Sequence, residues 1–138
     1  MWAVRVYTPY PLPARKDMKI YIAGYFNTKD RLLSVRDDIV RMGHVVVSTW
    51  LDEVPVLETE YDKWLSYAVR DYNEIALCDL LICDTFDITE RGGREVELGY
   101  ALGRMKSVWV VGPRRNVFHF SVRNFATWEK VLEELSTM

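Results

Sequence analysis

Two acidic residues occupy helix positions beside an apolar stripe, where an ionised side chain is unusual and needs an explanation. Glu97 borders the apolar stripe of an expected helix, and Asp71 lies on or beside the apolar stripe of another. Burial of an unpaired carboxylate is costly and raises its pKa, which would suit Asp71 as a general acid. The field at a helix N-terminus would keep Glu97 ionised, as a nucleophile or a charge stabiliser requires.

Both carboxylates also have a structural explanation. Asp71 could pair with Arg70, with Arg94, or with a helix cap at the edge of a sheet. An acidic residue near a helix start is favoured by the helix dipole, which is the role we assign to the neighbouring Glu95. Spacing alone leaves a functional and a structural interpretation open for Asp71 and Glu97.

The sequence contains none of several well-known motifs for catalysis or for cofactor and metal binding. Gly24 is not part of a GxGxxG fingerprint, and the pair Gly92–Gly93 lacks the lysine of a P-loop. No GxSxG elbow occurs, and no His, Cys and Asp set has the spacing of metal ligands. His44 and His119 lie in sequence contexts where a histidine is more often structural than catalytic. We therefore expect neither a metal nor an organic cofactor.

Composition restricts the class of protein further. The chain has 138 residues, 49% of them hydrophobic, which predicts one globular domain. Its net charge is -2, so it lacks the excess of basic residues that is typical of proteins that bind a nucleic-acid polymer. No apolar run reaches the length of a membrane span, and the first residues lack the apolar core of a signal peptide. Cys78 and Cys83 are interpreted as buried free thiols, so we expect a reduced, cytoplasmic setting.

Strand-like and helix-like segments alternate along the chain. We expect strands at 19–24, 44–49, 79–83 and 107–111, helices at 28–42, about 61–76 and from 93 onward, a short extended piece at 116–120 and a closing helix at 124–135. The long second helix should bury one face, and the third should bury a shorter stripe. The members of these two sets are Tyr61, Trp64, Leu65, Ala68, Tyr72, Ile75 and Ala76, and Leu98, Ala101, Leu102 and Met105.

This alternation predicts an α/β fold with a doubly wound, mainly parallel sheet, an α/β/α sandwich of the flavodoxin-like or Rossmann-like type. The domain is expected over residues 18–138, with residues 1–17 as an N-terminal extension. Ligands of such sheets bind outside the carboxyl ends of the strands, where the strand order reverses. The candidate site is therefore formed by the loops 24–28, 50–55 and 84–93.

Three motifs, in this order, resemble the nucleoside 2-deoxyribosyltransferase family, including its relatives that hydrolyse nucleoside 5'-monophosphates. The first is the strand and glycine loop Ile20–Phe26, and the second is Asp71 followed by Cys78–Asp79 at a strand start. The third and most specific is Gly93–Ala101, with its Glu-Leu-Gly-Tyr-Ala run. The resemblance covers about residues 18–112.

The resemblance implies cleavage of the N-glycosidic bond of a nucleoside or nucleotide, with transfer of the sugar to another base or to water. It implies that Glu97 is the nucleophile that forms a covalent ribosyl-enzyme, that Asp71 is the acid, and that Tyr21 lies near the catalytic carboxylate. It also implies a homodimer or higher homo-oligomer. The substrate-binding residues that we expect are Gly24, Tyr25, Asn27, Trp50, Asp84 and Gly93, with Trp50 stacking on the base.

The chain departs from the family pattern at two places. Glu95 stands where the family often has a second glycine, and the loop 84–93 has about two extra residues. Tyr25 and Phe26 resemble the transferases that act on free nucleosides more than the monophosphate hydrolases. A non-catalytic nucleotide-binding or sensing domain on the same fold is the alternative function.

Overall fold

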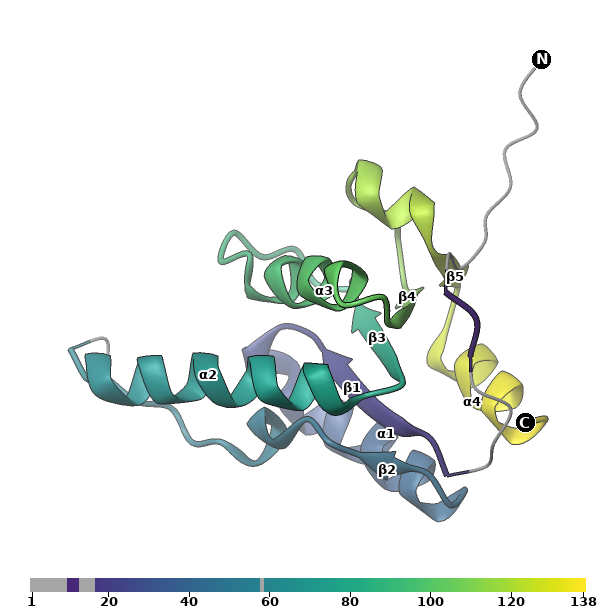
Figure 1. Cartoon of the computed structure of the whole chain (residues 1–138), viewed down its shortest axis with the longest axis horizontal. Coiled ribbons are helices and arrows are strands. Elements are labelled where there is room, and N and C mark those ends of the chain that lie inside the picture. Colours follow the sequence, from purple (N-terminus) through teal and green to yellow (C-terminus); the bar gives the residue numbers. More distant parts are fainter. Residues whose placement is uncertain (1–9, 13–16, 58) are drawn as a thin grey trace.

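A five-stranded parallel sheet organises the computed structural model, which describes residues 10–12, 17–57 and 59–138 (Figure 1). The strands have the order β2-β1-β3-β4-β5, and every neighbouring pair is parallel. This order reverses between β1 and β3, which is the switch point of a flavodoxin-type sheet. The strands are β1 Lys19–Ala23, β2 Val45–Val46, β3 Leu80–Asp84, β4 Ser107–Val111 and β5 Arg123–Phe125.

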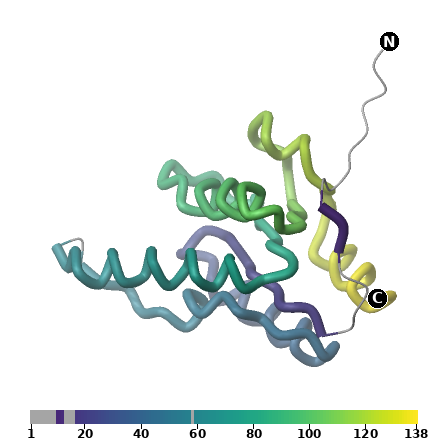
Figure 2. Tube along the Cα trace, in the orientation of Figure 1, coloured from purple at the N-terminus to yellow at the C-terminus, as the bar shows by residue number. Residues whose placement is uncertain are grey.

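Four α-helices cover the two faces of the sheet and confirm the predicted α/β/α class. Helices α2 and α3 pack together on one face, and α1 and α4 pack together on the other, as the trace in Figure 2 also shows. Three 3₁₀ segments lie in the connections. The helical elements are α1 Lys29–Arg41, α2 Tyr61–Leu77, α3 Gly93–Gly103, α4 Trp128–Ser136, η1 Phe26–Thr28, η2 Thr49–Asp52 and η3 Val117–Ser121.

The core lies along the three central strands. Every residue of β3 and β4 is buried, as is every residue of β1 after Lys19. Strands covered by helices on both faces need apolar side chains on both faces, which explains their continuous rather than alternating apolar sequence. Cys78 and Cys83 are buried and free, as predicted.

The second strand is much shorter than predicted. Only Val45 and Val46 pair with β1, and the chain then turns into η2. Side chains continue the contact with β1: the Ser48 Oγ accepts a hydrogen bond from the Ile22 N–H at 3.0 Å, and the Trp50 Nε1 donates to the Ile22 carbonyl at 2.7 Å. Because β2 is an edge strand, these two bonds replace a longer ladder.

The C-terminal elements also differ from the prediction. The segment expected to be extended at 116–120 is largely η3, because the Asn116 side chain accepts from the backbone N–H groups of Phe118 and His119 and starts a helical turn. The first residues of the expected helix 124–135 belong instead to β5. Helix α4 begins after Thr127, whose hydroxyl accepts from the Lys130 N–H.

The apolar face of α2 is largely solvent-exposed, contrary to prediction. Ile75 is fully buried, but Tyr61 is 76% exposed, Leu65 67% and Tyr72 40%. The end of the stripe expected on α3 is also wrong, because that helix ends at Gly103 and Met105 is 70% exposed. In this single chain, α2 therefore presents an apolar surface that nothing in the described residues covers.

Two short parts of the expected extension are described. The Tyr10 carbonyl accepts a hydrogen bond from the Ser107 hydroxyl, and Leu12 packs against the core. Met18 is fully buried. The β-prone piece at 4–8 lies outside the described residues. No helix in the described part of the chain combines the length and the apolarity that crossing a membrane requires.

Candidate active site

Glu97 lies on the second turn of α3, where that helix crosses the carboxyl end of β1. The helix starts after Gly92, whose φ of 74° is a left-handed conformation that favours glycine. Glu97 is partly buried, and its Oε2 accepts a hydrogen bond from the Tyr21 hydroxyl. Tyr21 itself is fully buried on β1. The sheet thereby holds the carboxylate in one orientation.

Burial dominates the electrostatics of Glu97. It raises the pKa of the carboxyl to about 8, against the hydrogen bond from Tyr21, which lowers it. The negative charge of Asp71 raises the pKa further. Burial therefore opposes the helix field that was expected to keep Glu97 ionised. Burial together with the nearby Glu97 also raises the pKa of Tyr21, so its phenol stays protonated and donates.

Asp71 faces the same region from α2 and is held by its neighbour in sequence. Arg70 Nε and Nη2 donate to Asp71 Oδ1 at 3.0 and 2.9 Å, and the same Nη2 donates to Glu53 Oε2 at 2.6 Å. Burial raises the pKa of Asp71 to about 6, although the hydrogen bonds from Arg70 lower it. The structural pairing of Asp71 with Arg70 is thus present, and it leaves Asp71 Oδ2 without a hydrogen bond to any described residue.

The two carboxylates line one cavity at the carboxyl ends of the strands, which we call the inner pocket. It has a volume of about 190 Å³. Both Asp71 and Glu97 contribute to its wall, and the cavity lies among the strand-end loops where the sequence predicts the site. The lining residues are Gly24, Tyr25, Phe26, Trp50, Glu53, Asp71, Thr89, Arg91, Gly93, Arg94 and Glu97.

A larger cavity adjoins the inner pocket, and we call it the outer cleft. Its volume is about 550 Å³. It shares Asp71 with the inner pocket but does not include Glu97. Its lining residues are Tyr25, Phe26, Asn27, Glu53, Pro55, Val56, Trp64, Tyr67, Ala68, Asp71, Arg91 and Gly93.

Most of the expected substrate-binding residues reach these cavities. Gly24 leaves no room for a side chain, because a Cβ there would lie 2.8 Å from Leu32 Cδ1. Trp50 is 6% exposed and its ring edge borders the inner pocket, so its indole is mostly packing. Asn27 lies in the outer cleft, where its Nδ2 donates to the Tyr25 hydroxyl at 2.9 Å.

Asp84 is the expected substrate-binding residue that lines neither cavity. It ends β3 and is 1% exposed. Its Oδ2 accepts from Arg31 Nη1 and from Trp128 Nε1, each at 2.7 Å, and its Oδ1 accepts from the Phe86 N–H at 3.1 Å. Three donors already occupy this carboxylate, which ties α1 and α4 to the end of β3.

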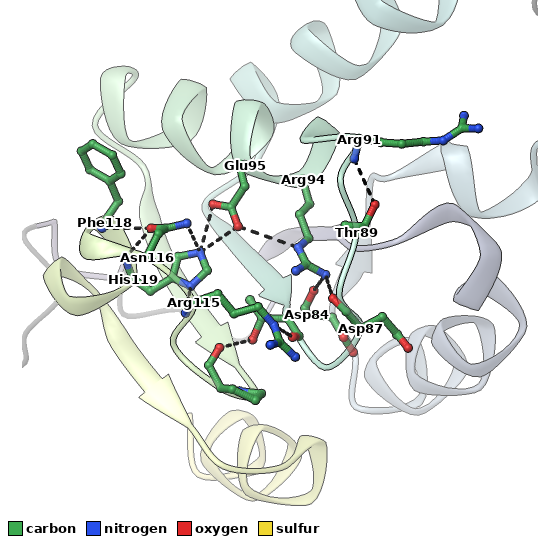
Figure 3. A network of polar contacts seen from close by, with 12 residues as sticks. Asp84, Asp87, Thr89, Arg91, Arg94, Glu95, Arg115, Asn116, Phe118 and His119 are labelled. Atoms are coloured by element: carbon green, nitrogen blue, oxygen red, sulfur yellow. Dashed lines mark hydrogen bonds and ion pairs between the residues drawn. The ribbon is translucent and has the colours of Figure 1, made fainter.

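A polar network, drawn in Figure 3, connects the loop 84–93 with α3 and η3 and includes Thr89, Arg91 and Arg94 of the inner-pocket wall. Arg94 is 4% exposed and donates to the Asp87 carbonyl at 2.7 Å. His119 Nδ1 accepts from the Arg115 N–H at 2.9 Å, so Nε2 carries the proton and donates to Glu95 at 2.9 Å. Glu95, expected only at the helix dipole, therefore also joins α3 to η3.

Four charged residues of the site were not expected there. Glu53 and Arg91 line both cavities, Arg94 lines the inner pocket, and Arg70 bridges Glu53 to Asp71. Glu53 and Arg91 lie in loops that the strand order already marked, whereas Arg70 and Arg94 were considered only as structural partners. Among the described residues, no three or more His, Cys, Asp or Glu side chains are grouped so as to hold a metal ion.

Comparison with known proteins finds likeness in structure. No family model matches the chain, and no curated protein matches its sequence significantly. A 2-deoxyribosyltransferase of Bacillus psychrosaccharolyticus superposes with a TM-score of 0.66 at 23% identity, over 83% of this chain and 90% of the other. The CMP N-glycosidase of Clostridium botulinum gives 0.56 at 16% identity, over 87% and 99%.

A conserved protein of Enterococcus faecalis has a TM-score of 0.67 at 15% identity, over 88% of this chain and 98% of that one. At such identities the likeness is one of fold. The chain shares the doubly wound fold of these proteins across nearly their whole length. In this chain, two partly buried carboxylates lie at the strand ends.

Proposed function

We propose that this chain cleaves the N-glycosidic bond of a nucleoside or nucleoside monophosphate through Glu97, and passes the ribosyl or deoxyribosyl group to a second base or to water. The observation that carries the proposal is the pairing of a Tyr21-bound Glu97 with Asp71 across one pocket. The shared fold with a 2-deoxyribosyltransferase and a CMP N-glycosidase supports the same class of reaction.

In the first step, a Glu97 oxygen attacks the anomeric carbon of the sugar. The bond between that carbon and the base nitrogen breaks, and its electron pair stays on the nitrogen. Asp71 gives its proton to the departing base. The products are an ester between the sugar and Glu97 and a neutral base, which is the first half of a retaining glycosidase cycle.

In the second step, a second base or a water molecule attacks the same carbon from the side that the first base left. Asp71, now ionised, accepts the proton of the attacking group, and the Glu97 carboxylate departs. A base as the attacking group makes the protein a transferase, and water makes it a hydrolase. Both outcomes restore the starting charges, and neither needs a step beyond these two carboxylates.

The two carboxyls hold one proton between them from about pH 6 to about pH 8, because these are the values to which burial raises the pKa of Asp71 and of Glu97. In the free protein that proton lies mainly on Glu97. Moving it to Asp71 costs free energy, because Glu97 has the higher pKa of the two. Positive charge developing on the bound sugar beside Glu97 offsets this cost, since it favours the ionised form.

The proposed roles of the remaining residues follow from their positions in the two cavities. Gly24 and Gly93 let the substrate approach backbone in the inner pocket, and Tyr25 borders both cavities. Asn27 can hydrogen-bond the base from the outer cleft, and Trp50, which is mostly buried, forms part of the wall of the inner pocket. Asp84 would act on the substrate only through the loop that it supports.

One assay tests the proposal. The protein is incubated with ribo- and deoxyribonucleosides and their 5'-monophosphates, with and without free adenine, and the products are separated. Released or exchanged base is expected with wild type and loss of at least a thousandfold with Glu97→Gln. If wild type binds nucleosides but neither releases nor exchanges any base, the protein is a nucleotide-binding domain instead.

We also propose that the chain forms a homodimer through α2. The exposed side chains Tyr61, Leu65 and Tyr72 share one face of that helix, and Val69 between them is 49% exposed. Apolar side chains in such a contiguous set are typical of an interface. Light scattering during gel filtration should give twice the monomer mass, and Leu65→Glu should give the monomer.

A further inference from the structure

The outer cleft is larger than an unsubstituted nucleobase requires and has aromatic walls. We propose that it is the subsite for the leaving base, and that it accepts bases carrying a bulky aromatic substituent on an exocyclic amine. This inference rests on the proposed function, because it names the substrate class of the same site.

The orientation follows from which carboxylate borders which cavity. Glu97 lines only the inner pocket, whereas Asp71 lines both cavities. The nucleophile must reach the anomeric carbon, and the acid must reach the nitrogen of the leaving base. The sugar therefore lies beside Glu97, and the base extends past Asp71 into the outer cleft.

The cleft has room for more than one heterocycle. Its volume of about 550 Å³ compares with about 190 Å³ for the inner pocket. Pockets that hold a complete small ligand have volumes of about 300–1,000 Å³, so the base side alone could hold one. A single purine ring system would leave much of this space to water.

The aromatic side chains in the wall of the cleft are suited to a flat ring. Trp64, on α2, is 44% exposed, and among the described residues no ring or cation stacks on it. Two other rings of the cleft are already engaged: Arg70 lies 4.7 Å from the Tyr67 ring centre, and Lys29 lies 4.9 Å from that of Phe26. The fourth ring, that of Tyr25, is tied to Asn27 through its hydroxyl. Trp64 is thus the ring of the cleft that has neither a hydrogen bond nor a ring or cation contact among the described residues, and it can stack on a substituent.

A hydrogen-bond acceptor also lines the cleft, joined to Asp71 through Arg70. Glu53 is 14% exposed, and its Oε2 is held by Arg70, while its Oε1 has no hydrogen bond to any described residue. A carboxylate oxygen accepts from an N–H group. A secondary exocyclic amine retains one such N–H after substitution, so Glu53 can bind it while the substituent continues toward Trp64.

The test compares N6-benzyladenosine with adenosine, each also as its 2'-deoxy form, in wild type, Trp64→Ala and Trp64→Phe. Wild type should cleave the benzyl compound with a kcat/KM at least equal to that of the parent. Trp64→Ala should lower kcat/KM for the benzyl compound about tenfold, which corresponds to one ring stack of about 1.4 kcal/mol, and for the parent less than threefold. Trp64→Phe should retain most of the benzyl preference.

Phe118→Ala is the matched control, because Phe118 is 65% exposed and lies in neither cavity. It should change neither ratio. The inference is overturned if wild type cleaves adenosine but cleaves the benzyl compound tenfold more slowly, or if Trp64→Ala lowers both values equally. In either case the proposed function stands.

A binding titration separates the two proposals when no substrate is cleaved. Both compounds are titrated into Glu97→Gln, with and without Trp64→Ala, by calorimetry. Tighter binding of the benzyl compound that Trp64→Ala abolishes supports the subsite even though the proposed reaction fails. Equal binding of the two compounds overturns the subsite as well.

Discussion

The Tyr21 hydroxyl donates a hydrogen bond to Glu97, 76 positions further along the chain. Tyr21 is fully buried in β1, and Glu97 faces it from α3. The bond stabilises the ionised carboxylate in a place where burial opposes ionisation. Orientation and charge of the proposed nucleophile therefore both depend on one phenol in the sheet.

Removal of this phenol provides the first prediction. Tyr21→Phe deletes a hydrogen bond that lowers the pKa of Glu97, so that pKa should rise above about 8. A hydrogen bond to a charged group contributes about 1.5–3 kcal/mol, so kcat should fall about 10- to 150-fold. The alkaline limb of the pH profile should move to higher pH. An unchanged alkaline limb would show that Tyr21 does not act on Glu97.

The wild-type pH profile provides the second prediction. The reactive pair needs one proton, which Asp71 and Glu97 hold together between about pH 6 and about pH 8. A plot of kcat/KM against pH should be bell-shaped with limbs near these values. A profile that is flat from pH 5 to pH 9 contradicts the assignment. Initial rates at saturating and at low substrate in buffers of constant ionic strength provide the measurement.

Arg70 provides the third prediction, as a positioning residue. Its hydrogen bonds hold Asp71 Oδ1 and lower the pKa of that carboxyl. Arg70→Met should raise the pKa of Asp71 above about 6, and the acidic limb should move to higher pH by about one unit, since a solvated ion pair is worth about 1 kcal/mol. Arg70→Lys keeps the charge and should recover most of the shift. Loss of activity with an unmoved acidic limb would indicate a fold defect alone.

Stability against pH provides the fourth prediction. The folded pKa of Glu97, about 8, lies above its unfolded value, so the folded protein keeps a proton that the unfolded chain loses. The free energy of unfolding should therefore decrease as the pH rises from about 4.5 to about 8. Glu97→Gln removes this loss and should melt at a higher temperature than wild type at pH 8.5, with a smaller difference at pH 5. Equal differences at both pH values would exclude a proton on Glu97.

The sequence by itself determined the fold class and the loops at the strand ends among which the candidate site lies. Buried strands have continuous apolar runs and helices have a 3.6-residue period, so local patterns located β1, β3 and β4 and the helices α1, α2 and α3. The parallel order then placed the loops after β1, β2 and β3 at one edge of the sheet. Asp71 and Glu97 were visible because each carboxylate borders an apolar stripe.

Only the tertiary structure decided which hydrogen-bond partners the charged side chains at the strand ends have. Arg70 reaches Glu53 as well as Asp71, and Trp128 takes the Asp84 carboxylate away from the pocket. Such choices join residues tens of positions apart, for which no local period exists. The short edge strands β2 and β5 were misjudged for a related reason, because side-chain hydrogen bonds end the one and a helical turn precedes the other. The raised pKa of Glu97 also depends on the tertiary structure. The helix dipole can be predicted from the sequence, but the burial that outweighs it arises only in the folded chain.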